Sequence, residues 1–138
     1  MRFMIIVKAS EDSEAGVMPE EKLLAAMQKY HEELADSGVL VDGSGLKPSS
    51  KGWRIRYSGD QRSFVDGPFA ETKELVAGYT IIDVKSRDEA IELTRRFPNP
   101  AGDGKAGEIE VREFFELEDF APSEAVERFR QMGMGKGN

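Results

Sequence analysis

An apolar run near the N-terminus constrains the fold more than any other feature of this chain. Phe3, Ile5 and Val7 lie on one face of an expected strand, and Met4 and Ile6 lie on the other. A strand that is apolar on both faces is buried on both sides, as happens at the centre of a sheet. The run is too short for a membrane span or for the apolar part of a signal peptide. We therefore expect a central strand in a cytoplasmic protein.

Hydrophobic periodicity divides the rest of the chain into further helices and strands. Apolar residues at spacings of three and four predict helices over residues 19–37, 87–97 and 122–132. Alternating or β-rich stretches predict strands at residues 39–41, 53–57, 62–65, 76–84 and 108–115. A polar, glycine-containing stretch predicts a loop over residues 9–18.

Local signals mark where these elements begin, turn and end. Gly38 is expected to end the first helix. Ser86 followed by Glu89 has the capping-box pattern of a helix start. Residues 58–61 have the composition of a hairpin turn, and Gly78 predicts a bulge or a close backbone approach in its strand.

The resulting order is strand, helix, strand, hairpin, strand, helix, strand, followed by a C-terminal helix. A chain of 138 residues fits one domain, which we place at residues 1–120. Residues 121–138 are expected to form a C-terminal helix and a flexible tail. Two helices can cover only one face of such a sheet, yet its first strand is apolar on both. We therefore predict that a second copy of the sheet covers the other face, in a homodimer.

The charge balance and the absence of cysteine disfavour several classes of function. The chain has 19 basic and 26 acidic residues and a net charge of −7, whereas nucleic-acid binding requires a basic surface. Arg54, Arg56 and Arg62 form a small cluster with acids nearby, which is expected to be solvated. With no cysteine and one histidine, we expect no disulfide, no cofactor and no metal site of the zinc type. No EF-hand spacing is present, and a carboxylate-only magnesium or calcium site is left open.

Asp66 stands directly before a Gly-Pro break, and two interpretations of it are open. In the first, its carboxylate caps its own turn and has no further role. In the second, Gly67 and Pro68 hold it beside an apolar wall formed by Phe69, where loss of solvent favours proton transfer. Asp66 is therefore a candidate catalytic residue, and Phe69 is a candidate substrate contact.

Four other side chains carry chemistry that a site could use. His31 lies at the margin of the apolar stripe of the first helix, either as a hydrogen-bonded boundary residue or as a catalytic residue. Lys73 is either solvated among neighbouring acids or offers a cation to a bound carboxylate or phosphate. Tyr79 and Arg112 are expected on the sheet face away from the helices, where Arg112 either pairs with another chain or strand or binds a ligand.

Three long blocks of the sequence carry a family resemblance. They read GVLVDGSGLKPSSKG, DGPFAETKELVAGYTIIDVKSRDEAIE and GEIEVR, and the resemblance extends over roughly residues 2–115. The chain resembles the YCII-related superfamily, in its DGPF-domain branch. The resemblance implies a ferredoxin-like α+β sandwich, here with an inserted hairpin, that dimerises in the manner of a dimeric α/β barrel.

The resemblance also gives two positions to check. In the YCII branch, a histidine on the first helix and an aspartate after the second helix face one cleft and are associated with acid–base chemistry. The matching positions here hold Met27 and Phe97, so neither member of that pair is present. His31 lies one turn after the first position, which leaves a replacement role open.

Two functions are therefore expected from the sequence. The first is a homodimer that binds a small polar molecule, with acid–base catalysis as a further step, in a pocket between the first helix, the open sheet face and the turn at Asp66. The second is a non-catalytic regulatory or adaptor module. It is implied by the resemblance, because some DGPF-type domains are fused or adjacent to sigma-type transcription factors.

Overall fold

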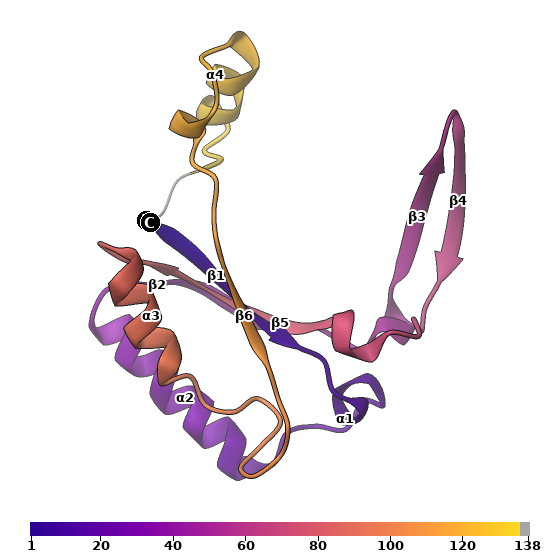
Figure 1. The fold of residues 1–138 in the computed structure, drawn as a ribbon, viewed down its shortest axis with the longest axis vertical. Coiled ribbons are helices and arrows are strands. Elements are labelled where there is room, and N and C mark those ends of the chain that lie inside the picture. The colour runs from indigo at the N-terminus through magenta and orange to yellow at the C-terminus, as the bar shows by residue number, and fades with distance from the viewer. Residues whose placement is uncertain (136–138) are drawn as a thin grey trace.

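Four antiparallel strands form the main sheet of the protein, in the order β2–β5–β1–β6 (Figure 1). They span Leu40–Gly45 (β2), Val76–Asp83 (β5), Arg2–Lys8 (β1) and Ile109–Glu113 (β6). The computed structural model describes residues 1–135, so residues 136–138 of the expected tail lie outside the described part. The predicted central position of the first strand is confirmed, because β1 pairs with β5 on one side and β6 on the other. Strand order and connections together give the predicted ferredoxin-like α+β fold.

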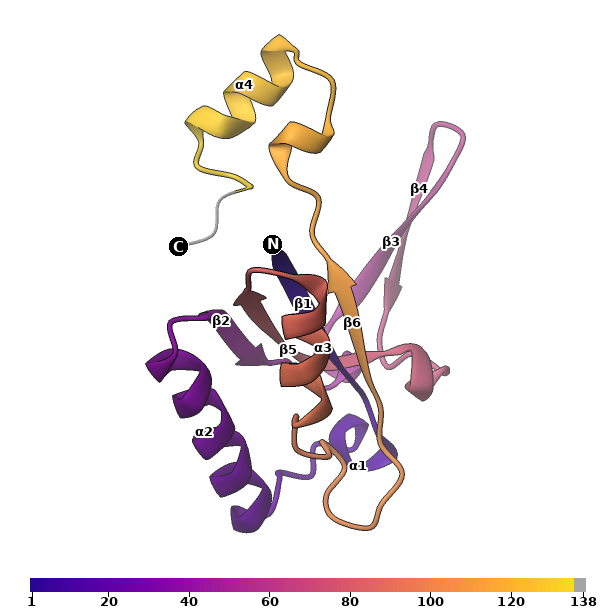
Figure 2. The same ribbon diagram turned by 60° about the vertical axis from the view of Figure 1, so that its left-hand side comes forward.

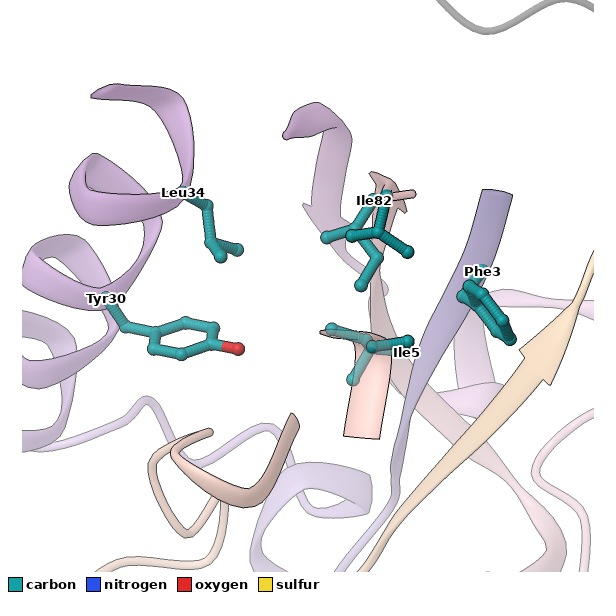
Figure 3. Close-up of a cluster of buried hydrophobic side chains, with 7 residues drawn as sticks. Phe3, Ile5, Tyr30, Leu34 and Ile82 are labelled. Carbon is teal, nitrogen blue, oxygen red and sulfur yellow. The ribbon is translucent and has the colours of Figure 1, made fainter. Parts of the chain in front are cut away.

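Two helices, α2 (Glu21–Asp36) and α3 (Arg87–Arg95), cover one face of this sheet (Figures 1 and 2). Figure 3 shows Tyr30 and Leu34 of α2 pointing toward Ile5 and Ile82 of the sheet. Together with the nearby apolar side chains these residues form the buried core: Phe3, Ile5, Tyr30, Leu34, Ile82, Val84 and Ala90. The Tyr30 hydroxyl donates a hydrogen bond to the Leu93 carbonyl over 2.7 Å, and burial raises the pKa of Tyr30.

The predicted helix ends are largely confirmed. Gly38 follows α2 with a φ of +78°, the left-handed conformation that glycine adopts most easily. At the start of α3 the Ser86 hydroxyl accepts a hydrogen bond from the Glu89 amide. The Glu89 carboxylate accepts instead from the Lys85 amide, one residue before the position that a capping box would use.

Two segments differ from the sequence-based expectation. The predicted loop at residues 9–18 contains a short helix, α1 (Glu11–Glu14), because Ser10 and Ser13 cap each other reciprocally and acidic residues occupy its first turn. The strand expected at residues 39–41 runs on to Gly45, since β5 supplies pairing partners along the glycine-rich stretch. Gly78 makes the close approach predicted for it, because a Cβ there would lie 3.0 Å from the Ser44 carbonyl oxygen.

Two projections leave the body on the side of the sheet opposite α2 and α3 (Figure 1). One is a hairpin formed by β3 (Trp53–Ser58) and β4 (Gln61–Asp66), which pair only with each other. The other is the C-terminal segment, with a 3₁₀ helix, η3 (Leu117–Asp119), and α4 (Glu124–Gln131). The predicted hairpin and C-terminal helix are therefore present, but neither packs on the main sheet.

The second sheet face has no covering layer within residues 1–135. Met4 and Ile6 of β1 lie on it beside Tyr79 and Ile81 of β5, and all four are only partly buried. Of the two apolar faces of β1, the helices therefore cover one and leave the other uncovered. Within residues 1–135, no helix combines the length and apolar composition that crossing a bilayer requires.

Candidate functional site

A cavity of about 690 Å³ lies at the C-terminal end of β1, between η2 (Thr72–Glu74), the start of α1 and residues 100–108. Its apolar lining comes from small side chains: Val7, Ala9, Ala70, Ala77, Ala101 and Ala106. Charged side chains also line it: Lys8, Glu11, Glu71, Lys73 and Glu108. Its lining thus resembles that of a small-molecule site, an apolar wall with a few polar groups.

The two lysines of this cavity have different electrostatic surroundings. The Lys8 ammonium lies 3.5 Å from the Glu110 carboxylate, which also accepts a hydrogen bond from Arg112 over 3.2 Å. The hydrogen bond from Arg112, and next the charge of Lys8, lower the pKa of Glu110. Lys73 makes no ion pair with any residue of 1–135. Lys73 is therefore the cation of this cavity that is available to a ligand.

A second cavity, of about 430 Å³, lies between the start of α2 and residues 98–105. The Lys22 ammonium and the Asp103 carboxylate meet across it over 2.8 Å. The hydrogen bond from Lys22 lowers the pKa of Asp103. Asp12, Glu20 and Lys105 also line this cavity, which is the smaller of the two.

His31 occupies the layer between α2 and the sheet. Its Nδ1 lies 2.7 Å from the Met27 carbonyl oxygen, and its Nε2 lies 2.8 Å from the Thr80 hydroxyl. A carbonyl can only accept, so Nδ1 carries a proton, and in the neutral ring Nε2 accepts from Thr80. The ring also meets the Phe97 ring edge-on, at a centroid distance of 6.1 Å. The two positions matched to the YCII pair, Met27 and Phe97, thus both contact His31.

The contacts of His31 predict a stability effect. Replacing it in His31→Phe should lower the free energy of unfolding by roughly 1–3 kcal/mol, because the buried Thr80 hydroxyl loses its partner. In the double variant His31→Phe/Thr80→Val both partners become apolar, so the loss should be smaller than the sum of the single losses. Urea unfolding measures all four proteins. Strictly additive losses would show that the pair is not coupled.

The turn at Asp66 is fixed against the segment before β3. The Gly67 amide donates to the Gly52 carbonyl over 3.0 Å, and the Phe69 amide donates to the Ser49 hydroxyl over 3.0 Å. The Ser49 amide in turn donates to the Glu14 carboxylate over 3.0 Å. This network joins α1, the residues after β2 and the residues after β4.

The side chains of this turn point to different surroundings. The Arg54 guanidinium lies over the Phe69 ring, 3.7 Å from its centroid. The Asp66 side chain is exposed and makes no hydrogen bond or ion pair to another residue of the described chain. The position of Phe69 therefore fits a packing role at the base of the hairpin, whereas Asp66 faces solvent.

Tyr79 and Arg112 lie on the uncovered sheet face, as their strand positions predict. The Tyr79 hydroxyl lies 3.4 Å from an Asp42 carboxylate oxygen, a long hydrogen bond. Arg112 pairs with Glu110 on its own strand. Within the protomer this pair replaces the expected contact of Arg112 with a neighbouring strand. Neither residue lines the cavity that contains Lys73.

The six candidate residues thus lie in four separate places. His31 is under α2, Tyr79 and Arg112 are on the opposite sheet face, Asp66 and Phe69 are at the hairpin base, and Lys73 is at the cavity. The expectation that the first helix and the open face share one pocket is wrong, because α2 covers the other face. Among residues 1–135, no group of three histidine, aspartate or glutamate side chains is arranged to hold a metal ion.

Several residues that shape these places were not singled out from the sequence. Glu14 and Ser49 bond across 35 positions of the chain, and no local pattern marks such a pair. Lys8 and Glu108 meet at the cavity because β1 ends beside the start of β6, where the Lys8 amide donates to the Glu108 carbonyl over 3.1 Å. Only the strand order of the sheet, with β6 beside β1, would have predicted that Lys8 and Glu108 lie close together.

Comparison with known proteins identifies a family and two similar proteins. A model of the YCII-related domain matches residues 1–118. An uncharacterized protein of Rhizobium meliloti is 31% identical over 93 residues, which cover 67% of this chain and 73% of the relative. A similar solved structure is 5-chloro-2-hydroxyhydroquinone dehydrochlorinase of Burkholderia phenoliruptrix in complex with 2,5-dihydroxybenzoquinone. It is 16% identical, with a TM-score of 0.43 over 84% of this chain and 95% of that one.

Proposed function

Because the chain belongs to the YCII-related family, we propose that it is a homodimeric protein that binds a small molecule with an apolar body and polar substituents. The observation that carries this proposal is the cavity of about 690 Å³ with small apolar side chains on its walls and an unpaired Lys73 beside it. The cavity volume falls within the range of small-molecule sites. The assignment to the DGPF branch and a cytoplasmic location remain predictions from the sequence.

The charges around the cavity indicate what a ligand should carry. The Lys73 ammonium can bind a carboxylate or another anionic group by a charge-assisted hydrogen bond. Glu11, Glu71 and Glu108 are acceptors for hydrogen-bond donors such as an amine or a hydroxyl. A small molecule that bears both an anionic group and a hydrogen-bond donor therefore matches the lining better than a simple anion does.

The homodimer is supported by the uncovered sheet face. Met4, Ile6 and Ile81 lie on it among polar and charged neighbours. A two-fold pairing of this face with its copy would bury these side chains and leave α2 and α3 on the outside. Tyr79 and Arg112 would then lie at the contact between the two sheets, where a ligand or the partner chain can reach them.

Acid–base catalysis is a further step of the same proposal. Asp66 is exposed and accessible for proton exchange, whereas both ring nitrogens of His31 already have partners. The two groups lie in different parts of the protomer. A reaction at Asp66 would therefore proceed without His31 of the same chain.

A titration with two small aromatic probes tests the cavity. We expect 4-aminobenzoate to bind the wild-type protein roughly ten-fold more tightly than the Lys73→Met variant, because the variant loses one charge-assisted hydrogen bond. Aniline lacks the carboxylate and should bind both proteins equally. Chemical-shift changes in NMR titrations measure both affinities.

A matched lysine variant separates a site effect from a general charge effect. Lys51 lies in the 3₁₀ helix before β3 and lines neither cavity, so Lys51→Met removes the same charge elsewhere. It should leave the affinity for 4-aminobenzoate unchanged. Equal weakening by Lys51→Met, or no binding of either probe to the wild type, would contradict the proposed site.

A regulatory or adaptor role is the second candidate function. The exposed aromatic side chains of the β3–β4 hairpin and the C-terminal segment favour it, since large exposed apolar patches mark interaction surfaces. In this alternative the partner is another protein, such as a sigma-type factor. A second copy of the same chain is the other possible partner for these exposed side chains. Measurements of Trp53 accessibility distinguish a second copy from another protein.

A further inference from the structure

One face of the β3–β4 hairpin is mostly apolar, and no part of residues 1–135 covers it. Trp53, Ile55, Tyr57 and Phe64 lie on this face, with Asp66 and Arg62 opposite Trp53 and Tyr57. Trp53, Tyr57 and Phe64 are 62%, 66% and 59% exposed, although Ile55 pairs with Phe64 and the Trp53 and Phe64 rings stack at a centroid distance of 6.1 Å. Each strand has six residues, so the hairpin extends about 20 Å from the body. An isolated two-stranded hairpin is marginally stable in water, so a partner that covers this face would stabilise the hairpin.

The C-terminal segment exposes a second set of apolar side chains. The Phe115 and Phe120 rings contact each other with centroids 5.3 Å apart, and both are exposed. Phe129 and Met132 lie three positions apart on and just after α4 and are exposed as well. Figures 1 and 2 show the hairpin and this segment as separate projections of one chain, so they do not cover each other.

The charges of the two projections are complementary. The hairpin has three arginines and two aspartates over residues 53–66, whereas residues 113–131 have six acids and two arginines. Two hairpins brought together would repel, and so would two C-terminal segments. The charges favour contact between the hairpin of one copy and the C-terminal segment of another.

The exposed areas agree with such a contact. Three large aromatic side chains and one isoleucine at these exposures present roughly 400 Å² on the hairpin, and the C-terminal segment presents about as much. Each copy would bury both surfaces in a reciprocal exchange, or about 800 Å² per protomer. A stable interface needs about that area on each partner.

We propose that the apolar face of the β3–β4 hairpin of one copy packs on the C-terminal segment of a second copy, Phe115–Met132, and that the exchange is reciprocal around a two-fold axis. The inference rests on the homodimer of the proposed function and adds arms to its sheet-to-sheet contact. The partner for these surfaces is therefore the same chain rather than another protein.

Trp53 is a built-in probe of this contact, because it is the one tryptophan of the chain. Sedimentation velocity first defines concentrations at which the protein is a dimer and a monomer. We expect acrylamide to quench Trp53 several-fold less in the dimer than in the dilute monomer. Phe120→Ser should restore several-fold stronger quenching at the higher concentration, whereas Leu24→Ser, an exposed apolar site on α2, should change nothing.

Introduced cysteines give a second, geometric readout, since the chain has none of its own. Differently tagged copies of Ile55→Cys and Phe120→Cys are mixed, oxidised and separated by mass. A disulfide between the two tagged copies is expected. Arg56→Cys lies on the opposite face of the same strand and should form at least several-fold less of the mixed product with Phe120→Cys.

Each contrary result has a distinct meaning. A dimer whose Trp53 is as accessible as in the monomer overturns the arm exchange and leaves the homodimer standing. A monomer at micromolar concentration overturns both, while the Lys73 titration still tests the cavity independently. Protection of Trp53 in the monomer, or only after another protein is added, also overturns the inference, and the second outcome favours the adaptor alternative.

Discussion

Leu34→Ala is expected to lower the free energy of unfolding by about 3–5 kcal/mol. The Leu34 side chain is 2% exposed and points from α2 into the core opposite Ile82 (Figure 3). Tyr30 and Leu34 are the buried residues of α2, so they carry much of the attachment of this helix to the sheet. Truncation removes favourable apolar contacts and leaves a cavity that the surrounding core fills only in part.

Leu24 provides the matched control for this substitution. It lies on the same helix with 47% of its side chain exposed, so Leu24→Ala changes the same atoms without opening a core cavity. Its expected cost is within about 0.5 kcal/mol. Urea unfolding followed by circular dichroism measures both variants. Similar losses for Leu24→Ala and Leu34→Ala would contradict the placement of α2 on the sheet.

The sequence pattern predicted the main sheet well because that part of the fold depends on local periodicity. The two-sided apolar alternation of β1 specifies a central strand, and β1 does lie between β5 and β6. The spacing of apolar residues in α2 placed Tyr30 and Leu34 on one stripe, and both are buried. The side-chain periods of strands and helices mark such apolar faces locally.

The same periodicity could not show which apolar faces remain uncovered. Trp53, Ile55 and Tyr57 alternate as regularly as the residues of β1, but their strand forms a hairpin that stands apart from the core. Alternation identifies a face, and only the tertiary arrangement decides what covers it. The inserted hairpin was therefore predictable as a hairpin but not as a projection.

The candidate site was the part that the sequence resolved least. His31 was placed at the margin of a helical stripe, but its partner Thr80 lies 49 positions away on β5. The sequence predicts one pocket for Asp66 and His31, because sequence spacing carries no information on which sheet face a helix covers. The structure separates them, and it brings Lys73 to a cavity with residues from β1 and from the segment before β6.

The DGPF segment, residues 66–69, lies apart from His31 and lines no part of the cavity that contains Lys73. In the described chain its backbone holds the hairpin base through Gly67 and Phe69, while its one carboxylate faces solvent. If the hairpin packs on a second copy, this base fixes the direction in which the hairpin leaves the body. The segment then contributes to assembly through its backbone, independently of any proton transfer by Asp66.

Gly67→Ala is expected to destabilise this base by about 2–3 kcal/mol. A Cβ at residue 67 would lie 1.8 Å from the Ser49 carbonyl oxygen and 2.6 Å from its carbon. Both are backbone atoms, so relief requires the segment before β3 to move, and with it the hydrogen bond from the Gly67 amide to Gly52. The hairpin should detach locally while the main sheet and its core remain folded.

Limited trypsin digestion measures this detachment, because Arg54, Arg56 and Arg62 supply cleavage sites within the hairpin. When opening is fast relative to cleavage, a cost of about 2 kcal/mol raises the rate of cutting there roughly 30-fold. Gly52→Ala is the control from the same contact: its Cβ would lie an ordinary 3.7 Å from the Ser49 carbonyl oxygen, so cleavage should change little. Equal rates for the two variants would contradict the clash, because both remove a glycine but only Gly67→Ala places a Cβ against backbone atoms. Faster cutting in Gly67→Ala would instead place the requirement in the close approach of two chain segments.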